Sequence, residues 1–499
     1  MNRPVRNLAI GCMVLFLALL INATYLQYWQ SDDLSSLSKH PDNRRVLDAA
    51  FSRPRGAIVV KGKEIAESVK SNDAYKYQRR YPQPRQYAQI TGFFSRDSGI
   101  GGIEATQNSI LSGDDSKLFV NRVIDLVGND DPQGGSVSLT INPKAQKAAY
   151  DGLRALGDNV RGAVVALDPA TGRVLAMISS PSYDPNRLAS HDFSAATKAR
   201  KSLLDNPLGP LNNRAIEEVL PPGSTFKLVT AAAALESGRY EPDTLVPGGA
   251  RLDLPQTSTD LVNHTGGSCG ADRITLTRAL QVSCNVSFGA IGLKIGADAL
   301  TEQAEKFGFG DRAFHDLDDA LTRQAISRMT APGQDEIDPP QTALSAIGQS
   351  NVAATPLQMA MITAGIANGG TVMRPYLVDE IRSNDLEVID KTSPDAVAEN
   401  AVSAATARKL TDMMVAVVDN GTAGSARIPG VKVAGKTGTA QSAADRPPYA
   451  WFVSFAPADN PTVAVAVLVQ DAGVERDQIS GSGLAAPIAK AVMEAVLNP

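Results

Sequence analysis

Hydrophobic residues are gathered most densely near the N-terminus, where Leu8–Ile21 carries no polar side chain. Counted through Trp29 the segment has 22 residues, and as a helix it would be about 33 Å long, enough to cross a bilayer. Two arginines precede it and aromatic residues close it, as at the inner and outer boundaries of a membrane helix. The pattern predicts a transmembrane signal anchor over residues 8–29, a cytoplasmic tail of residues 1–7, and an extracytoplasmic location beyond residue 30.

A cleaved signal peptide is the alternative for this segment. The strictly apolar run has 14 residues, and a run of that length alone would suit the core of a signal peptide. No small-x-small cleavage site follows the run, so an uncleaved anchor is the interpretation that we prefer.

The pattern changes twice between residues 30 and 155. Residues 30–50 are polar and charged, and they predict a juxtamembrane linker. From residue 51 onward short apolar runs alternate with turn signals, which is typical of a small α+β domain. In that domain Val137–Ile141 predicts a strand, and Asn142-Pro143 begins a helix that continues through apolar residues to Leu153. We expect a linker and an N-terminal pedestal domain over residues 30–155, with this helix leading to the next domain.

Residues 156–499 predict a second, larger domain whose first and last segments both form strands. The middle, residues 222–420, is mainly helical in pattern, and apolar residues at helical spacing end the chain. Since both ends of the segment supply strands, we expect one antiparallel sheet in which they meet. The predicted strands are Ala163–Leu167, Arg173–Ile178, Val431–Gly435, Trp451–Ala456 and Thr462–Gln470, and the closing helix is Ala485–Leu497.

Composition narrows the range of functions. The chain has 499 residues, of which 43% are hydrophobic and 20% charged, with a net charge of −5 and a pI near 5.6. A length of this kind predicts at least two domains, and the acidic balance argues against a nucleic-acid-binding protein. The four histidines are scattered and no Cys-x-x-Cys occurs, so no metal site is predicted. The scattered histidines also disfavour a Ser-His-Asp hydrolase.

Ser224 and Lys227 are the first candidates for catalysis. Their spacing of three residues places a hydroxyl and an amine on one face of a helix, where the amine can take the proton as the hydroxyl attacks a carbonyl. Ser36–Lys39 has the same spacing, but only Ser224 follows Pro-Pro-Gly, which delivers it to a helix start where free N–H groups favour negative charge. The alternative for Ser224 is a simple N-cap serine.

Two further clusters lie downstream. Ser283-Cys284-Asn285 alone in the chain fits Ser-x-Asn, and only Lys436-Thr437-Gly438 reads Lys-Thr-Gly. In an extended or tightly turned segment, Ser283 and Asn285 face the same way and Cys284 faces the other. Taken alone, such a segment would more often be a turn than a site.

The three clusters in this order resemble the penicillin-recognising serine acyltransferases, which include penicillin-binding proteins and serine β-lactamases. Other stretches are similar to class B penicillin-binding proteins, most of all to the A-type enzymes of actinobacteria. Arg55-Gly56 resembles the pedestal of that class, although Val59–Gly62 replaces its usual Asp-Arg-Asn-Gly turn, which leaves the local turn open. The other similar stretches are Gly101–Glu104, Arg161–Asp168, Ser180–Asn186, Asn213–Ala215 and Gly348–Ala360.

The resemblance implies a helical layer packed on a five-stranded antiparallel sheet, and peptidoglycan D,D-transpeptidation through a serine acyl-enzyme that β-lactams inhibit. Ser224 would be the nucleophile and Lys227 its base, if burial and the charge of Lys436 lower its pKa. Ser283 would relay a proton and Asn285 would bind a substrate amide. Lys436 and Thr437 would hold the substrate carboxylate, Gly438 would allow close approach, and the N–H groups of Ser224 and Thr439 would form the oxyanion hole.

The implied partners are stem peptides that end in D-Ala-D-Ala, β-lactams and, by family analogy alone, a SEDS-family polymerase in the membrane. No cofactor is required by this scheme. A β-lactamase would share the clusters but needs fast deacylation and no anchor, and a D,D-carboxypeptidase differs only in using water as acceptor. A non-enzymatic alternative is a membrane-anchored scaffold or β-lactam sensor, for which residues 1–7 offer too short a cytoplasmic portion.

We predict a disulfide between Cys269 and Cys284. Both lie beyond the anchor, where thiols can oxidise, and Cys12 lies within it. Glycines around Cys269 give the backbone freedom to reach disulfide geometry. Two buried free thiols are the alternative, because spacing alone does not establish proximity.

Overall fold

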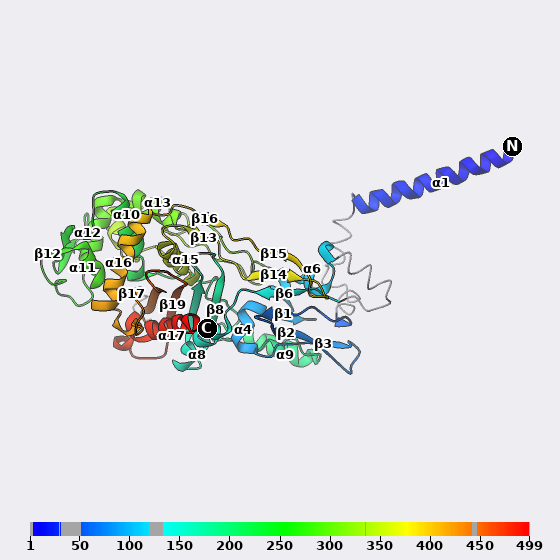
Figure 1. Cartoon of the computed structure of the whole chain (residues 1–499), viewed down its shortest axis with the longest axis horizontal. Coiled ribbons are helices and arrows are strands. Elements are labelled where there is room, and N and C mark those ends of the chain that lie inside the picture. Colours follow the sequence, from blue (N-terminus) through cyan, green and yellow to red (C-terminus); the bar gives the residue numbers. More distant parts are fainter. Residues whose placement is uncertain are drawn as a thin grey trace.

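The computed structural model describes residues 3–28, 30, 51–118, 133–334, 336–441 and 447–498. Helix α1 (Arg3–Tyr28) includes a stretch, Arg3–Leu26, that is long and apolar enough to cross a membrane, and its most apolar window is not buried at all. Figure 1 shows α1 apart from the remaining elements. Of the linker predicted over residues 30–50, all but residue 30 lies outside the described residues.

A six-stranded sheet forms the pedestal, with the strand order β15-β14-β6-β1-β2-β3. Strands β1 and β6 are parallel, and the other neighbours are antiparallel. Two of its strands, β14 and β15, come from the sequence range that predicted the larger domain, so a hairpin from that range completes the sheet. The strands are β1 (Ile58–Val60), β2 (Lys63–Lys70), β3 (Tyr77–Arg80), β6 (Ser136–Leu139), β14 (Val378–Arg382) and β15 (Val388–Lys391).

The pedestal is held together by a buried ionic cluster. Glu104 is fully buried, and its carboxylate accepts hydrogen bonds from Arg55 Nε at 2.5 Å and Arg79 Nε at 2.6 Å. Arg55-Gly56 and Gly101–Glu104, two stretches that resembled class B penicillin-binding proteins in sequence, thus meet in one ion-pair cluster. The turn between β1 and β2 consists of Lys61 and Gly62 with φ of 45° and 76°, the conformation of a two-residue hairpin. Small elements complete the domain: α4 (Pro84–Thr91), α5 (Ile103–Thr106), α6 (Asn108–Ser112), β4 (Phe94–Ser95) and β5 (Gly99–Ile100).

The larger domain is built on a five-stranded sheet of order β17-β18-β19-β7-β8, in which all neighbours are antiparallel. The sequence-based prediction of this sheet is confirmed, with strand ends shifted by a few residues. The third predicted strand begins later and extends further, because it continues through Lys436–Thr439. The strands are β7 (Arg161–Leu167), β8 (Val174–Ser180), β17 (Ala434–Ala440), β18 (Tyr449–Ala456) and β19 (Val463–Asp471).

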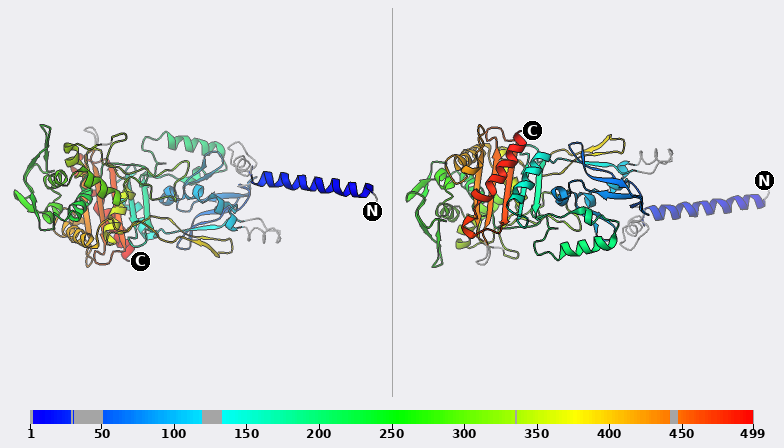
Figure 2. Two further views of the ribbon diagram at one scale, coloured as in Figure 1. Left: turned by 90° about the horizontal axis from the view of Figure 1, so that it is seen from above. Right: turned by 90° about the horizontal axis from the view of Figure 1, so that it is seen from below.

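Helices cover both faces of this sheet, and every residue of β18 is buried. Helices α8 (Pro143–Ala155) and α17 (Ala486–Leu497) pack together on one face, and α15 (Pro356–Ala367) and α16 (Ala404–Asn420) cover the other. The two views of Figure 2 show these opposite sides. Helix α8 is capped by Asn142, whose Oδ1 accepts from Lys144 N and Ala145 N, and it connects the pedestal to the sheet, as its sequence predicted.

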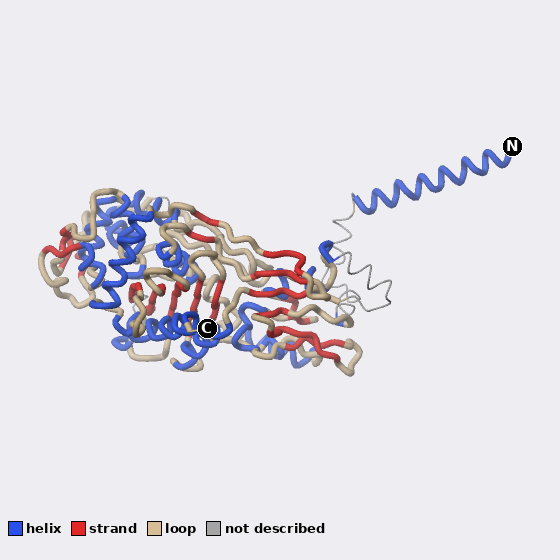
Figure 3. The backbone as a smooth tube through the Cα atoms, viewed as in Figure 1, coloured by secondary structure: helices blue, strands red, loops and turns tan. Residues whose placement is uncertain are grey.

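The middle of the chain forms a helical region beyond the sheet, at the end farthest from the pedestal (Figure 3). Its helices are α10 (Lys227–Glu236), α11 (Leu276–Gln281), α12 (Asn285–Ile295), α13 (Ala297–Lys306) and α14 (Pro339–Ser345). Short strand pairs that the sequence pattern did not predict accompany them: β9 (Leu245–Pro247) with β12 (Arg273–Thr275), β10 (Arg251–Asp253) with β11 (Asp260–Val262), and β13 (Val372–Met373) with β16 (Ala396–Ala398). A further helix, α9 (Phe193–Leu204), lies beside the pedestal.

Candidate active site

Ser224 lies in a 3-10 turn, Gly223–Thr225, that leads directly into α10. The turn is fixed on both sides: Thr225 Oγ1 donates to Pro222 O at 2.7 Å, and Trp451 Nε1 of β18 donates to Pro221 O at 3.0 Å. Among the residues that the structure describes, the Ser224 hydroxyl has no hydrogen-bond partner, which leaves it available to a substrate.

Lys227 begins α10 one turn after Ser224, and its side chain is fully buried. Its amine lies 2.7 Å from Ser283 O, 2.7 Å from Asn285 Oδ1 and 3.3 Å from Ser283 Oγ. The first two partners are carbonyl oxygens, which can only accept. Three acceptors match the three protons of an ammonium ion, and a neutral amine can still donate to both carbonyl oxygens and keep its lone pair, so these hydrogen bonds fit either protonation state.

Ser283 lies between α11 and α12 with φ of 59°, a left-handed conformation that is uncommon for serine. The loop is held from outside the motif: Asn263 Oδ1 accepts from Asn285 N at 3.0 Å and from Val286 N at 3.1 Å. Behind it, Cys284 is joined to Cys269 by a disulfide with a Cα–Cα distance of 5.9 Å. Cys12 lies in α1 as a free thiol.

Lys436 reaches the same point from the sheet. Its amine, fully buried in the middle of β17, donates to Ser283 Oγ at 2.9 Å and to Thr437 O at 2.7 Å. The hydroxyl of Ser283 therefore lies between the amines of Lys227 and Lys436. Three segments that are far apart in sequence meet here.

Burial lowers the pKa of both amines. Burial, and then the positive charge of Lys436, lower the pKa of Lys227 well below its usual range. Burial lowers the pKa of Lys436 to about 7. The shift of the Lys227 pKa has the two causes that the sequence suggested, namely desolvation and a second cation nearby.

Gly438 allows β17 to lie against the turn that carries Ser224. A Cβ atom added at Gly438 would lie 2.9 Å from Thr225 Cγ2 and 3.1 Å from Pro222 O, so a larger residue would push the strand away. Close by, a Cβ atom added at Gly223 would lie 3.0 Å from Thr439 O, so the backbone of β17 lies against the turn that carries Ser224. Thr437 is nearly buried, at 8% exposure, and its hydroxyl lies 2.7 Å from Thr422 Oγ1.

Sequence reasoning missed Asn263, Thr422 and Gln281, which support the site from neighbouring segments. Asn263 lies in a loop after β11 and Thr422 just after α16, where a polar residue is ordinary. Only their spatial neighbours single them out, so no local signal was available.

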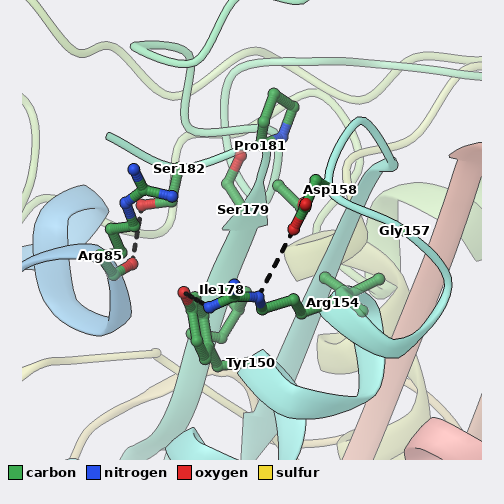
Figure 4. Close-up of a pocket in the computed structure, with 11 residues that line it drawn as sticks. Arg85, Tyr150, Arg154, Gly157, Asp158, Ile178, Ser179, Pro181 and Ser182 are labelled. Carbon is green, nitrogen blue, oxygen red and sulfur yellow. Dashed lines mark hydrogen bonds and ion pairs between the residues drawn. The ribbon is translucent and has the colours of Figure 1, made fainter. Parts of the chain in front are cut away.

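The hollow in Figure 4 is separate from these clusters, and none of its lining residues belongs to them. It has a volume of about 60 Å³ and lies between α8 and the end of β8. Some of its polar groups already have partners: Arg154 Nε is 3.6 Å from Asp158, and Ser182 Oγ donates to Arg85 O at 2.7 Å. It offers no alternative catalytic centre.

Comparison with known proteins gives consistent matches. Residues 162–494 match the penicillin binding protein transpeptidase domain, and residues 55–137 match the penicillin binding protein A dimerisation domain. The chain is 43% identical to peptidoglycan D,D-transpeptidase PbpA of Mycolicibacterium smegmatis, covering 100% of this chain and 99% of that protein. The PbpA of Mycobacterium tuberculosis is 42% identical, over 100% and 99% of the two chains.

Solved structures that are similar to this chain are also penicillin-binding proteins. The ceftriaxone acyl-enzyme complex of penicillin-binding protein A from M. tuberculosis has a TM-score of 0.85 and 41% identity, covering 90% of this chain and 100% of that one. A Pseudomonas aeruginosa PBP2 complex has a TM-score of 0.73 and 30% identity, over 90% and 96% of the two chains. The architecture is thus shared with proteins of known structure.

Proposed function

The chain belongs to the class B penicillin-binding protein transpeptidases, and we propose that it cross-links peptidoglycan with Ser224 as nucleophile and Lys227 as its base. The observation that carries the assignment is the buried Lys227 amine one turn after Ser224, whose pKa is lowered well below its usual range by burial and by Lys436. In its neutral form this amine has a lone pair for the proton of a neighbouring serine.

Acylation then proceeds in balanced steps. Ser224 Oγ forms a bond to the carbonyl carbon of the penultimate D-Ala while its proton moves to Lys227. The N–H groups of Ser224 and Thr439 stabilise the oxyanion that develops. As the carbonyl re-forms, the C–N bond to the terminal D-Ala breaks, and the departing amine takes a proton from Ser283 Oγ. Lys227, 3.3 Å from that oxygen, returns its proton to Ser283 and is neutral again.

Deacylation reverses these steps with a different amine. The acceptor amine of a neighbouring stem passes a proton through Ser283 to Lys227 as it attacks the ester. The new amide forms, the ester bond breaks, and Ser224 recovers its proton from Lys227. Since every proton moves between the same three side chains, no metal or cofactor enters the scheme.

Substrate binding is assigned to the walls of the site. Lys436 and Thr437 bind the terminal carboxylate, Asn285 binds a peptide amide, and β-lactams react with Ser224 because they mimic D-Ala-D-Ala. In support, penicillin-binding protein A of M. tuberculosis, which shares 41% identity with this chain, forms acyl-enzyme complexes with ceftriaxone and imipenem.

Location and partners follow from α1 and the domain order. Residues 8–29 anchor the protein once in the cell membrane, residues 1–7 are cytoplasmic, and residues 30–155 and 156–499 lie outside the cytoplasm as pedestal and transpeptidase domain. The apolar helix Arg3–Leu26 and the disulfide support this topology. A SEDS-family polymerase in the same membrane is the partner that we propose for the anchor and pedestal.

The test is a reaction with a pentapeptide stem as donor and a stem with a free side-chain amine as acceptor, followed by mass spectrometry. The proposal predicts a cross-linked dimer and release of one D-Ala per cross-link. Release of D-Ala without dimer, in the presence of excess acceptor, would make the protein a D,D-carboxypeptidase instead.

A further inference from the structure

The segment that follows α16 connects the two walls of the active site. Thr422 Oγ1 lies 2.7 Å from Thr437 Oγ1 on β17. On its other side the same segment contacts α11, the helix that ends two residues before Ser283. None of the clusters that define the family includes Thr422.

Gln281, the last residue of α11, holds this segment in place. Its Nε2 donates to Asn420 O at 3.0 Å and to Ala416 O at 3.3 Å, and its backbone oxygen accepts from Thr422 N at 3.3 Å. A Cβ atom at Gly421 would lie 2.5 Å from Gln281 O, so glycine permits this close approach. The backbone that carries Thr422 is therefore held against α11.

Proton counting defines what the pair of hydroxyls can do. Each hydroxyl has one proton, and among the described residues the Thr422 hydroxyl has no partner other than Thr437. If Thr422 donates to Thr437, then the proton of Thr437 is free to point into the site, and the donated hydrogen bond makes Thr437 a stronger donor. A bond in the opposite direction would occupy the proton that a substrate carboxylate needs.

We propose that Thr422 is a positioning residue that directs the Thr437 hydroxyl toward the free carboxylate at the end of the substrate, and so favours substrates with that carboxylate. This inference rests on the proposed function, because it assumes that Thr437 binds the carboxylate. Thr422 does not touch the reacting atoms. A residue that merely held the loop would influence all substrates alike.

The test compares penicillin G with its methyl ester, which differ only in the carboxylate. Second-order acylation rate constants are measured for the wild type, Thr422→Val and Thr422→Ser. Valine keeps the shape and removes the hydroxyl, and we expect it to slow acylation by penicillin G about tenfold, as for one lost hydrogen bond to a charged group. The rate with the ester should change less than about twofold, and serine should restore the preference for the acid.

An equal loss with acid and ester, or no loss with either, would overturn the inference. If the valine variant is unstable in thermal melts, Thr422→Ala is compared with Thr422→Ser in the same assay. The measure is again the rate constant for penicillin G divided by that for its methyl ester. The behaviour of the wild type distinguishes a failure of the proposed function from a failure of the role proposed for Thr422. A wild type that penicillin G does not acylate contradicts the proposed function, whereas a wild type that reacts normally beside a valine variant with unchanged selectivity contradicts only the role of Thr422.

Discussion

At the scale of single residues, the two buried amines have different duties. Lys227 is surrounded by acceptors and its pKa lies well below the usual range, because it is desolvated and next to Lys436. The lowered pKa favours the neutral amine, which is the form that can accept a proton. Lys436, with a pKa of about 7, changes between cation and neutral amine in the same pH range, and only the cation attracts a carboxylate.

The pH dependence of acylation follows from Lys436. Above about pH 7 the free enzyme loses the positive charge of this residue, so the second-order rate constant for penicillin G should fall as pH rises through 7. The methyl ester of penicillin G has no carboxylate to attract, and its rate constant should not show this fall. Stopped-flow measurements from pH 5.5 to 9 test both. A flat alkaline limb for the acid, or the same fall for the ester, would contradict this role of Lys436.

At the scale of elements, the loop that carries Ser283 depends on supports outside its own motif. Its left-handed residue lies between two helices, Asn263 bonds its backbone, and the disulfide Cys269–Cys284 fixes it from behind. The sequence identified the motif and suggested the disulfide from compartment and spacing. It did not identify Asn263, since a hydrogen bond across 22 residues leaves no periodic pattern.

Removing the disulfide should destabilise the domain more than it changes the chemistry. The cross-link spans 15 residues, and closing such a loop stabilises the folded state by about 3 kcal/mol in the chain-entropy model. The double variant Cys269→Ala/Cys284→Ala should therefore unfold at lower guanidinium concentration than the wild type, with Cys12→Ala as the matched control. Equal midpoints for the double variant and the wild type would refute this contribution.

At the scale of the whole molecule, pedestal and transpeptidase domain share a sheet. Strands β14 and β15 pair with β6 of the pedestal, although they follow α15 of the larger domain in sequence. The local pattern predicted the five-stranded sheet because its strands are long and apolar, with clear turns between them. It could not predict that β14 joins the sheet of the pedestal, because β14 is short and half-exposed and its partner β6 is far away in sequence.

Because the domains share this sheet, the pedestal should unfold together with the catalytic domain. Glu104→Gln leaves two buried arginines without their carboxylate, a change that typically costs about 3–5 kcal/mol. We expect one calorimetric transition at a lower temperature, with penicillin labelling lost in the same transition. Glu67→Gln is the control, since Glu67 pairs with the exposed Arg80 and such surface pairs contribute at most about 1 kcal/mol. Two separate transitions, with labelling unaffected by the first, would show that the domains unfold independently.

The most direct test of the central claim is to locate the penicillin G adduct by mass spectrometry, using protein that starts at residue 31. The wild type should gain one penicilloyl group, on the peptide that contains Ser224. Ser224→Ala should gain none, and Lys227→Ala should react at least about a thousandfold more slowly, because nucleophile and base act as a unit. An adduct on another residue, or an undiminished rate in Ser224→Ala, would contradict the assignment of Ser224 as the nucleophile.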